Sequence, residues 1–240
     1  MKFTAYSKVA LMMLAGAAML PRPVSAQEQT RQDGVSAPPA LSMAITDLQS
    51  RWDQVNYRIS DKDEQAKALK SLEEKADRIV ASFPHSADVK IWDGIIYSTD
   101  AGVVGGISAL SKINKARELF EDALKIDESA MNGGAHTSLG SLYYKVPGWP
   151  ISFGDNDMAE KHLKAALAIS PDDIDANYFY GDFLMSTKKY EEAVPVLEKA
   201  MQAPERPGRE IADTGRRKEI QADLDTAQEK LKTALGKKYN

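Results

Sequence analysis

The sequence predicts an all-α protein: an α-solenoid of about three stacked helix pairs, with an N-terminal helical pair and a C-terminal capping helix. The main observation is a spaced pattern, Gly-x2-[Tyr/Leu] followed by Ala-x3-[Phe/Leu]-x2-Ala, which occurs three times. In the clearest copy, Gly181 and Leu184 precede Ala193, Leu197 and Ala200. Small residues at these points let two antiparallel helices touch closely, and the large residues fill the gaps between neighbouring pairs.

The other two copies keep the same order. They are Gly140-x2-Tyr143 with Ala159-x3-Leu163-x2-Ala166, and Gly94-x2-Tyr97 with Ala116-x3-Phe120-x2-Ala123. Ala159 and Ala193 lie 34 residues apart, and in this period the pattern resembles the tetratricopeptide repeat. Because stacked helical repeats serve as scaffolds, the resemblance favours recognition of a partner over catalysis.

The N-terminal segment, residues 1–26, has the features of a secretory signal peptide. Two lysines begin it, a twelve-residue apolar run follows, and Val24-Ser25-Ala26 fits cleavage after Ala26. The run is shorter than the roughly 20 apolar residues of a membrane span; an uncleaved anchor is the alternative. Residues 27–40 are polar, contain Gly and Pro and lack an apolar period, which predicts a flexible leader.

Amino-acid composition limits the cellular compartment that the chain fits and the classes of partner that it could bind. The chain contains no cysteine, which excludes disulfides, thiolate chemistry and a lipoprotein anchor at the end of the signal. An exported chain without cysteine fits the periplasm of a Gram-negative bacterium. Loss of residues 1–26 would take the formal net charge from −4 to −7, because that segment holds three cations and no acids. An acidic chain argues against nucleic acid and anionic membrane surfaces as partners.

The helical domain is expected over residues 41–236, with a frayed tail at 237–240. Two helices precede the repeats, as a degenerate repeat or, in the favoured interpretation, an N-terminal cap; Asp61 with Glu64 predicts the start of the second of them. The three repeats are expected at residues 86–128, 129–171 and 172–204. Residues 209–235 hold strong helix formers and a partial apolar stripe, which indicates a helix that covers the last repeat.

Two of the repeats carry insertions between their paired helices. The repeat glycine and alanine lie 12 residues apart in the third copy, 19 in the second and 22 in the first. The excess of seven and ten residues predicts two enlarged turns that emerge together on one edge, where partners of stacked repeats often bind.

The seven-residue insertion falls within residues 143–157, where prolines and glycines fix a non-helical path. Trp149 and Phe153, with an isoleucine between them, are large apolar groups in this loop. They either tuck onto the helices beneath or contact a ligand or partner. Asp155 or Asn156 is placed to cap the next helix, and the acidic run there lacks the spacing of a calcium loop.

The ten-residue insertion, residues 98–108, contains Gly-Val-Val-Gly-Gly. It resembles a phosphate-binding loop only loosely, because the Lys-Ser/Thr ending and a preceding strand are missing. A close-packed flexible turn is the favoured interpretation. The apolar Val103 and Val104 would also suit the lining of an apolar cavity.

The first helix of each tetratricopeptide pair lines the concave face of the superhelix. Counted from the repeat glycines, the inward positions are Ile91, Ile95, Ser98, Thr137, Ser141, Tyr144, Tyr178, Asp182 and Met185. This row is apolar at one end and aromatic and polar at the other, without the basic cluster that clamps peptide carboxylates. It suits an apolar small molecule or a protein helix, or the side chains only pack within the superhelix.

Basic residues gather near the final helix, with acids interleaved. They are Arg206, Arg209, Arg216, Arg217 and Lys218. Local ion pairs on a solvated face are the favoured interpretation, and an anion site is the alternative.

Catalysis finds little support in the sequence. None of the three histidines lies in a HExxH motif, there is no GxSxG elbow, and His162 is expected on an exposed helix face. We therefore expect no catalytic residue, no metal ligand and no cofactor.

The chain also resembles a more specific family. The run from Gly140 to Asp155, with its Val-Pro-Gly-Trp-Pro centre, resembles the signature loop of the TatT family, the periplasmic T component associated with TRAP transporters (tripartite ATP-independent periplasmic transporters). Residues 177–183 and 206–213 extend the resemblance. It implies a helical scaffold with a central cavity that docks a periplasmic solute-binding protein and passes on a hydrophobic ligand. The characterised T component is a lipoprotein, whereas this chain has no cysteine to lipidate.

Three functional hypotheses follow: a periplasmic binding scaffold of this type, a general cell-envelope assembly scaffold without a small ligand, and, least favoured, an enzyme. Self-association stays open, and no stable membrane span is expected. The candidate ligand- or partner-binding residues are Tyr144, Trp149, Phe153, Tyr178, Asp182, Met185, Ile95, Val103 and Val104. A ligand carrier should enclose the two insertions around a cavity, whereas a pure scaffold should expose or bury them.

Overall fold

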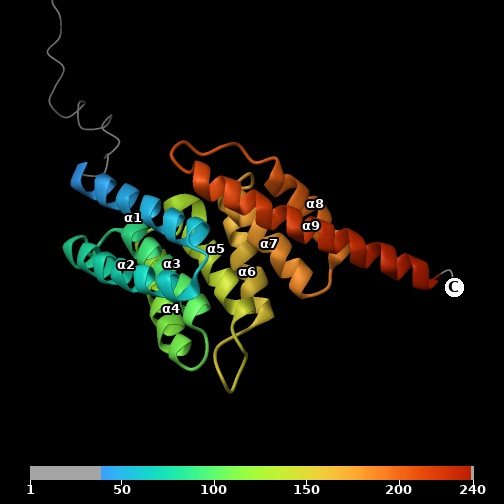
Figure 1. Cartoon of the computed structure of the whole chain (residues 1–240), viewed down its shortest axis with the longest axis horizontal. Helices are drawn as coiled ribbons and strands as arrows, with labels where there is room; N and C mark the ends of the chain where they lie inside the picture. Colours follow the sequence, from blue (N-terminus) through green and yellow to red (C-terminus); the bar gives the residue numbers. More distant parts are fainter. Residues whose placement is uncertain (1–38, 239–240) are drawn as a thin grey trace, which may run out of the picture. The chain divides into compact units, whose positions relative to one another are not determined.

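The computed structural model describes residues 39–238, and these form an array of helices without a named strand (Figure 1). The helices are α1 (Pro39–Arg58), α2 (Lys62–Ser82), α3 (Ala87–Val104), α4 (Ser108–Ile126), α5 (Ala130–Lys145), α6 (Asn156–Ile169), α7 (Ile174–Ser186), α8 (Tyr190–Met201) and α9 (Glu210–Lys238). The start of α5 is irregular, because Met131, Asn132 and Gly133 have positive φ angles. The predicted signal peptide lies outside the described residues.

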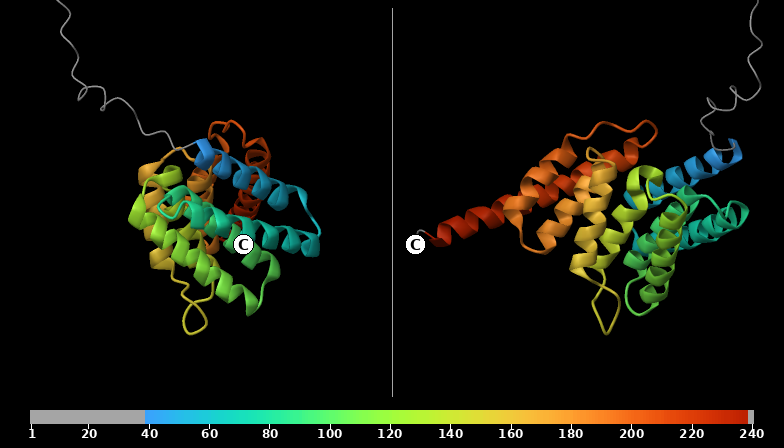
Figure 2. Two further views of the ribbon diagram at one scale, coloured as in Figure 1. Left: turned by 90° about the vertical axis from the view of Figure 1, so that its left-hand side faces the viewer. Right: turned by 180° about the vertical axis from the view of Figure 1, so that it is seen from behind.

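Three antiparallel pairs, α3–α4, α5–α6 and α7–α8, stack in chain order (Figures 1 and 2). The pairs match the three sequence repeats, which confirms the predicted all-α solenoid. The expected leader overlaps the first two residues of α1, and α9 continues two residues into the expected tail.

The three repeat glycines occupy equivalent contacts between the paired helices. A Cβ atom built on Gly94 would lie 2.5 Å from the ring of Phe120; on Gly140 it would lie 2.5 Å from Leu163, and on Gly181 2.5 Å from Leu197. Real Cβ atoms do not approach other carbons this closely. Each pair is therefore closed by a large side chain of its second helix seated directly on glycine in its first.

Side-chain caps set the helix starts. The Asp61 carboxylate accepts a hydrogen bond from the backbone N–H of Glu64 at 2.8 Å, as predicted. Asp155 accepts from the first two N–H groups that follow Asn156, and Asp173 caps α7 in the same way. These carboxylates satisfy N–H groups that the helix cannot bond internally, at the positive end of its dipole.

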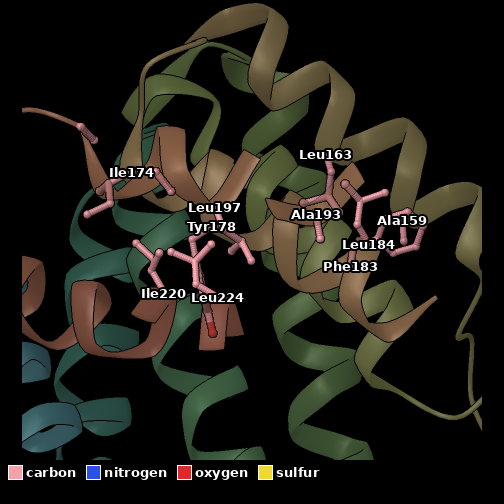
Figure 3. Close-up of a cluster of buried hydrophobic side chains, with 12 residues drawn as sticks. Ala159, Leu163, Ile174, Tyr178, Phe183, Leu184, Ala193, Leu197, Ile220 and Leu224 are labelled. Carbon is pink, nitrogen blue, oxygen red and sulfur yellow. The ribbon is translucent and has the colours of Figure 1, made fainter. Parts of the chain in front are cut away.

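Helix α9 covers the last repeat and also reaches back to the first helix. Ile220 and Leu224 lie beside Tyr178 of α7 in the close-up of the core (Figure 3). The ring of Tyr57 in α1 lies against Gly215 of α9 so closely that no side chain would fit there. The N-terminal and C-terminal helices therefore meet, an arrangement that the repeat pattern does not predict.

We expect Gly140→Leu to lower the free energy of unfolding by about 1–3 kcal/mol or more, because the side chain would force α5 and α6 apart. Chemical denaturation measures the change. Gly102→Leu is the matched control: Gly102 is also helical, but a Cβ there meets nothing within 4 Å. Equal stability of the two variants would contradict the role given to the repeat glycines.

Candidate interaction site

The α5–α6 loop, formed by the seven-residue insertion, is fixed at its base. Phe153 lies edge-on to Tyr143 with ring centroids 5.4 Å apart, and the guanidinium of Arg117 stands 4.3 Å from the Phe153 ring. Val146 is buried on the opposite side of the loop. Phe153 thus tucks onto the helices beneath, which was one of the two predicted alternatives.

Backbone hydrogen bonds tie the two sides of this loop together. The N–H of Gly154 donates to the carbonyl of Pro147 at 2.9 Å, and the N–H of Asp155 donates to the carbonyl of Tyr143 at 2.9 Å. A Cβ on Gly154 would collide with the Val146 carbonyl, so the crossing requires glycine. The loop therefore has a defined path that projects beyond the helix ends (Figure 1).

The tip of this loop carries two large, exposed apolar side chains. Trp149 is 91% exposed and Ile151 is 66% exposed. Trp149 is joined to Pro150 by a cis peptide bond. The alternative in which Trp149 and Phe153 line a pocket is not seen in the described structure, because Trp149 is exposed to solvent and Phe153 packs at the base.

The ten-residue insertion does not form an enlarged turn. Most of residues 98–108 extend α3 and α4, and only Gly105, Gly106 and Ile107 separate the two helices. Val103 packs against the core of α1 to α3, while Val104 is 41% exposed. The favoured interpretation of the whole insertion as a turn is therefore wrong, because helix continuation satisfies the backbone of most of the inserted residues. The alternative in which Val103 and Val104 line an apolar cavity is not seen either.

Two of the predicted concave residues, Tyr144 and Asp182, meet where α5 and α7 face each other. The hydroxyl of Tyr144 donates to Asp182 at 2.7 Å, and the Lys145 ammonium binds the same carboxylate oxygen at 2.8 Å. That ammonium also stands 5.4 Å from the rings of Tyr144 and Phe179. Burial, followed by the charge of Asp182, raises the pKa of Tyr144 well above its ordinary value, so this phenol stays protonated.

The rest of the predicted row is dispersed. Tyr178 is buried beneath α9, with the guanidinium of Arg216 4.3 Å from its ring. Met185 packs against the same core from α7, whereas Ile95 belongs to the core around α3. Lys145, which was not among the predicted residues, is the charged partner that links Asp182 to the aromatic rings. Its position next to Tyr144 in the sequence does not indicate this contact, because neighbouring residues of a helix point in different directions.

Of the basic residues at the start of α9, three form ion pairs that are largely covered, so the expectation of ion pairs is confirmed but that of a fully solvated face is wrong. Arg209, the residue directly before α9, binds both oxygens of Asp53 at 3.0 Å, which ties the start of α9 to α1. Arg206 and Arg216 both bind Asp175 at 2.7 Å, at the start of α7. Although burial raises the pKa of Asp175, these two guanidiniums hold it well below its ordinary value. We call these five residues the α1–α7–α9 clasp.

The histidines of α5 and α6 pair with each other. Nδ1 of His136 lies 2.9 Å from Nδ1 of His162, and Tyr143 stacks on the His162 ring. Burial lowers the pKa of His136 and takes that of His162 to about 4. His162 is therefore half-buried and neutral near pH 7, contrary to the exposed position expected for it.

Two surface hollows lie away from all nine predicted binding residues. A polar one of about 300 Å³ lies at the start of α9, around Arg206 and Arg217. A mostly apolar one of about 430 Å³ lies where Leu41, Phe83 and Ile126 meet. Within residues 39–238, no three His, Cys, Asp or Glu side chains gather closely enough to hold a metal ion. None of the helices in that range has the length and apolarity that crossing a membrane requires.

We expect Asp53→Ala to cost about 3–5 kcal/mol of stability, because it leaves the Arg209 charge buried without its carboxylate. Hydrogen exchange of residues 210–220 should accelerate as α9 loosens from α1. Asp47→Ala is the matched control on α1, since its ion pairs with Arg51 and Lys75 are partly exposed and should contribute only about 0–1 kcal/mol. Similar losses in the two variants would show that the clasp does not hold the helices together.

Stability should also depend on pH through Asp93, beside the first repeat glycine. Its carboxylate is 1% exposed, and neither oxygen has a hydrogen-bond partner among the described residues. Burial raises its pKa to about 7, above the unfolded value of 3.8. The stability that this group contributes is therefore complete below about pH 4 and is lost as the pH rises through 7.

Asp93→Asn should accordingly raise the free energy of unfolding at pH 8 by on the order of 1–3 kcal/mol, and flatten its fall between pH 5 and 8. Denaturant titrations at several pH values measure both effects. Asp172→Asn, at an exposed carboxylate, should leave the pH dependence unchanged. A pH profile that Asp93→Asn does not alter would contradict this assignment.

One comparison with known proteins bears on the fold. Residues 151–206 match the family model of the tetratricopeptide repeat, a stretch that runs from the tip of the α5–α6 loop through α8. No curated protein matches the chain. Tetratricopeptide arrays generally act as non-enzymatic scaffolds for protein–protein interaction. The described part of this chain is an all-α solenoid with tetratricopeptide-type repeats.

Proposed function

We propose that this protein is a periplasmic interaction scaffold of the TRAP T-component type, which docks a solute-binding protein through its α5–α6 loop. The observation that carries the proposal is the exposed tip of that loop. Trp149 and Ile151 stand in solvent while the base is tied by backbone hydrogen bonds. The resemblance of residues 140–155 to the T-component signature loop supports the choice of partner class.

The energetics favour a partner at this tip. Tryptophan is enriched among residues that dominate binding energy, because a rigid ring offers a large contact area at a small cost in conformational entropy. A loop that is already ordered has little further entropy to lose when it binds. Residues 146–154 carry no charged side chain, so covering the tip leaves no charge without solvent.

The structure supports the binding of a small apolar ligand less than it supports the docking of a protein. The residues expected to enclose a small ligand are divided between the α5–α6 loop, the core around α3, the contact of α5 with α7 and the core beneath α9. We therefore place protein docking first, and a general envelope scaffold as the second candidate function.

We expect Trp149→Ala to weaken binding of the proposed solute-binding-protein partner by about tenfold or more, with little change in melting temperature because the side chain is exposed. Calorimetry and thermal unfolding measure the two effects. Phe153→Ala is the control in the same loop, and should lower stability through loss of its packing on Tyr143. Unchanged affinity of the Trp149 variant would refute docking at the tip.

A second experiment identifies the partner directly. A photo-crosslinking amino acid at position 149 should capture a solute-binding protein in cells, while the same group at the exposed Gln228 of α9 should not. Capture of unrelated envelope proteins alone would favour the general scaffold.

A further inference from the structure

The two histidines between α5 and α6 are not used in the proposed docking of a partner. Nδ1 of His136 lies 2.9 Å from Nδ1 of His162, and both rings are half-buried. At this distance one Nδ1 carries a hydrogen and donates it to the lone pair of the other. A second proton would place two N–H groups and two positive charges against each other. The contact can therefore form only while at most one of the rings is protonated.

One of these rings supports the base of the α5–α6 loop. Tyr143 stacks on His162 with ring centroids 5.6 Å apart and an angle of 9° between the planes. Two further contacts of Tyr143 belong to the loop: its ring meets Phe153 edge-on, and its carbonyl accepts a hydrogen bond from the N–H of Asp155 at 2.9 Å. A displacement of the His162 ring would therefore disturb both the aromatic packing and a backbone hydrogen bond at the base of the loop.

The surroundings of the pair oppose the charged form of the rings. Burial lowers the pKa of His162 to about 4, and the charges of His136 and Lys161 act in the same direction. Burial also lowers the pKa of His136; Lys161 adds to this fall, and Glu128 of the α4–α5 turn opposes it. Three more charged groups face Tyr143 from α4 and from the end of the loop, namely Arg117, Glu121 and Asp155.

The folded protein therefore keeps protons off these rings. Each histidine has a lower pKa in the fold than the ordinary value of 6.5. The stability that the neutral pair contributes is thus complete above about pH 6.5 and is lost as the pH falls toward 4. A form of the loop base in which the rings are exposed takes up the protons that the closed form excludes, so its population rises in acid.

We propose that the His136–His162 contact is a pH-sensitive switch, which holds the base of the α5–α6 loop at neutral pH and releases it in acid. Protonation of both rings separates them and withdraws His162 from Tyr143. The base then loses its packing, and the loop that projects beyond α5 and α6 (Figure 2) is no longer held in one position.

The release of the loop is a property of the chain alone. Its effect on a partner rests on the proposed function: an ordered loop has less entropy to lose on binding, so the released tip should bind the partner less tightly in acid. The measurement that tests the switch uses no partner, and its failure is therefore distinct from a failure of docking.

Hydrogen exchange of the full chain, followed by NMR between pH 7 and 5, tests the switch. The N–H groups of Gly154 and Asp155 close the base of the loop. Each proton that only the open form binds multiplies the opening constant by up to about ten per pH unit. After correction for the intrinsic pH dependence of exchange, the protection of these two groups should fall by about tenfold or more. The N–H of Lys189, bonded to the carbonyl of Leu184 in the α7–α8 turn, should keep its protection.

Substitution of the histidines identifies the groups that take up the protons. His162→Phe keeps a ring against Tyr143 but binds no proton, so most of the fall in protection should disappear. His136→Gln offers an amide to His162 and removes the second charge, and it should also reduce the fall. His85→Phe is the matched control, because His85 is exposed and precedes α3; it should leave the fall unchanged.

Buried carboxyl groups that titrate in the same range act in the opposite direction. Burial raises the pKa of Glu73 and Asp93 to about 7, and that of Asp223 to about 6. A raised pKa means that the folded protein binds the proton more tightly than the unfolded chain does. Protonation of these groups therefore stabilises the fold as the pH falls, and it cannot produce the loosening expected of the histidine pair.

Constant protection of Gly154 and Asp155 between pH 7 and 5 in the unmodified chain would overturn the proposal, whether or not the variants fold. An undiminished fall in His162→Phe would do the same, and so would an equal fall at Lys189, because either result would place the acid-sensitive group elsewhere.

Discussion

The close approach of two helices at a glycine is the constraint on which the other features of this solenoid depend. Gly94, Gly140 and Gly181 each receive a large side chain from the paired helix. The alanines that flank those side chains on the second helices are fully buried. A packed interior has little room for an added carbon, so each glycine fixes the spacing of its pair. Three equal spacings let the pairs stack in register and place the turns within each pair on one edge.

The solenoid is held at its ends by a different interaction. Asp53 in α1 pairs with Arg209, which directly precedes α9, and Asp175 in α7 pairs with Arg216 of α9. Asp53 and Arg216 are buried, and their partners are largely covered. Burying charges costs free energy, which close pairing with several hydrogen bonds offsets. Such a network contributes less to stability than to the choice of one arrangement, because a shifted α9 would leave each charge without a partner. The N-terminal and C-terminal helices are thereby held against each other.

The α5–α6 loop combines an anchored base with an uncovered tip. Leaving the Trp149 ring in water forgoes on the order of 3 kcal/mol that burial would contribute. The same loop uses Phe153 for packing and Gly154 for a backbone crossing that no other residue permits. Since the base is well packed, exposure of the tip does not follow from a loose loop. A rigid apolar projection is the form expected of a surface that another protein covers.

Local spacing and chemistry in the sequence determined the helix pairs, the glycine contacts and the Asp61 cap, because each depends on residues within one repeat. Spacing could not decide how inserted residues are used: those up to Val104 extend α3, whereas those around Trp149 form a projecting loop. Nor could it reveal that Arg209 binds Asp53, since the two are 156 positions apart and meet only when every pair has stacked. Side-chain identity within a repeat is a local property that the sequence shows directly. Side-chain exposure and ion pairing between distant helices depend on how all the helix pairs stack, so only the tertiary structure decided these two properties.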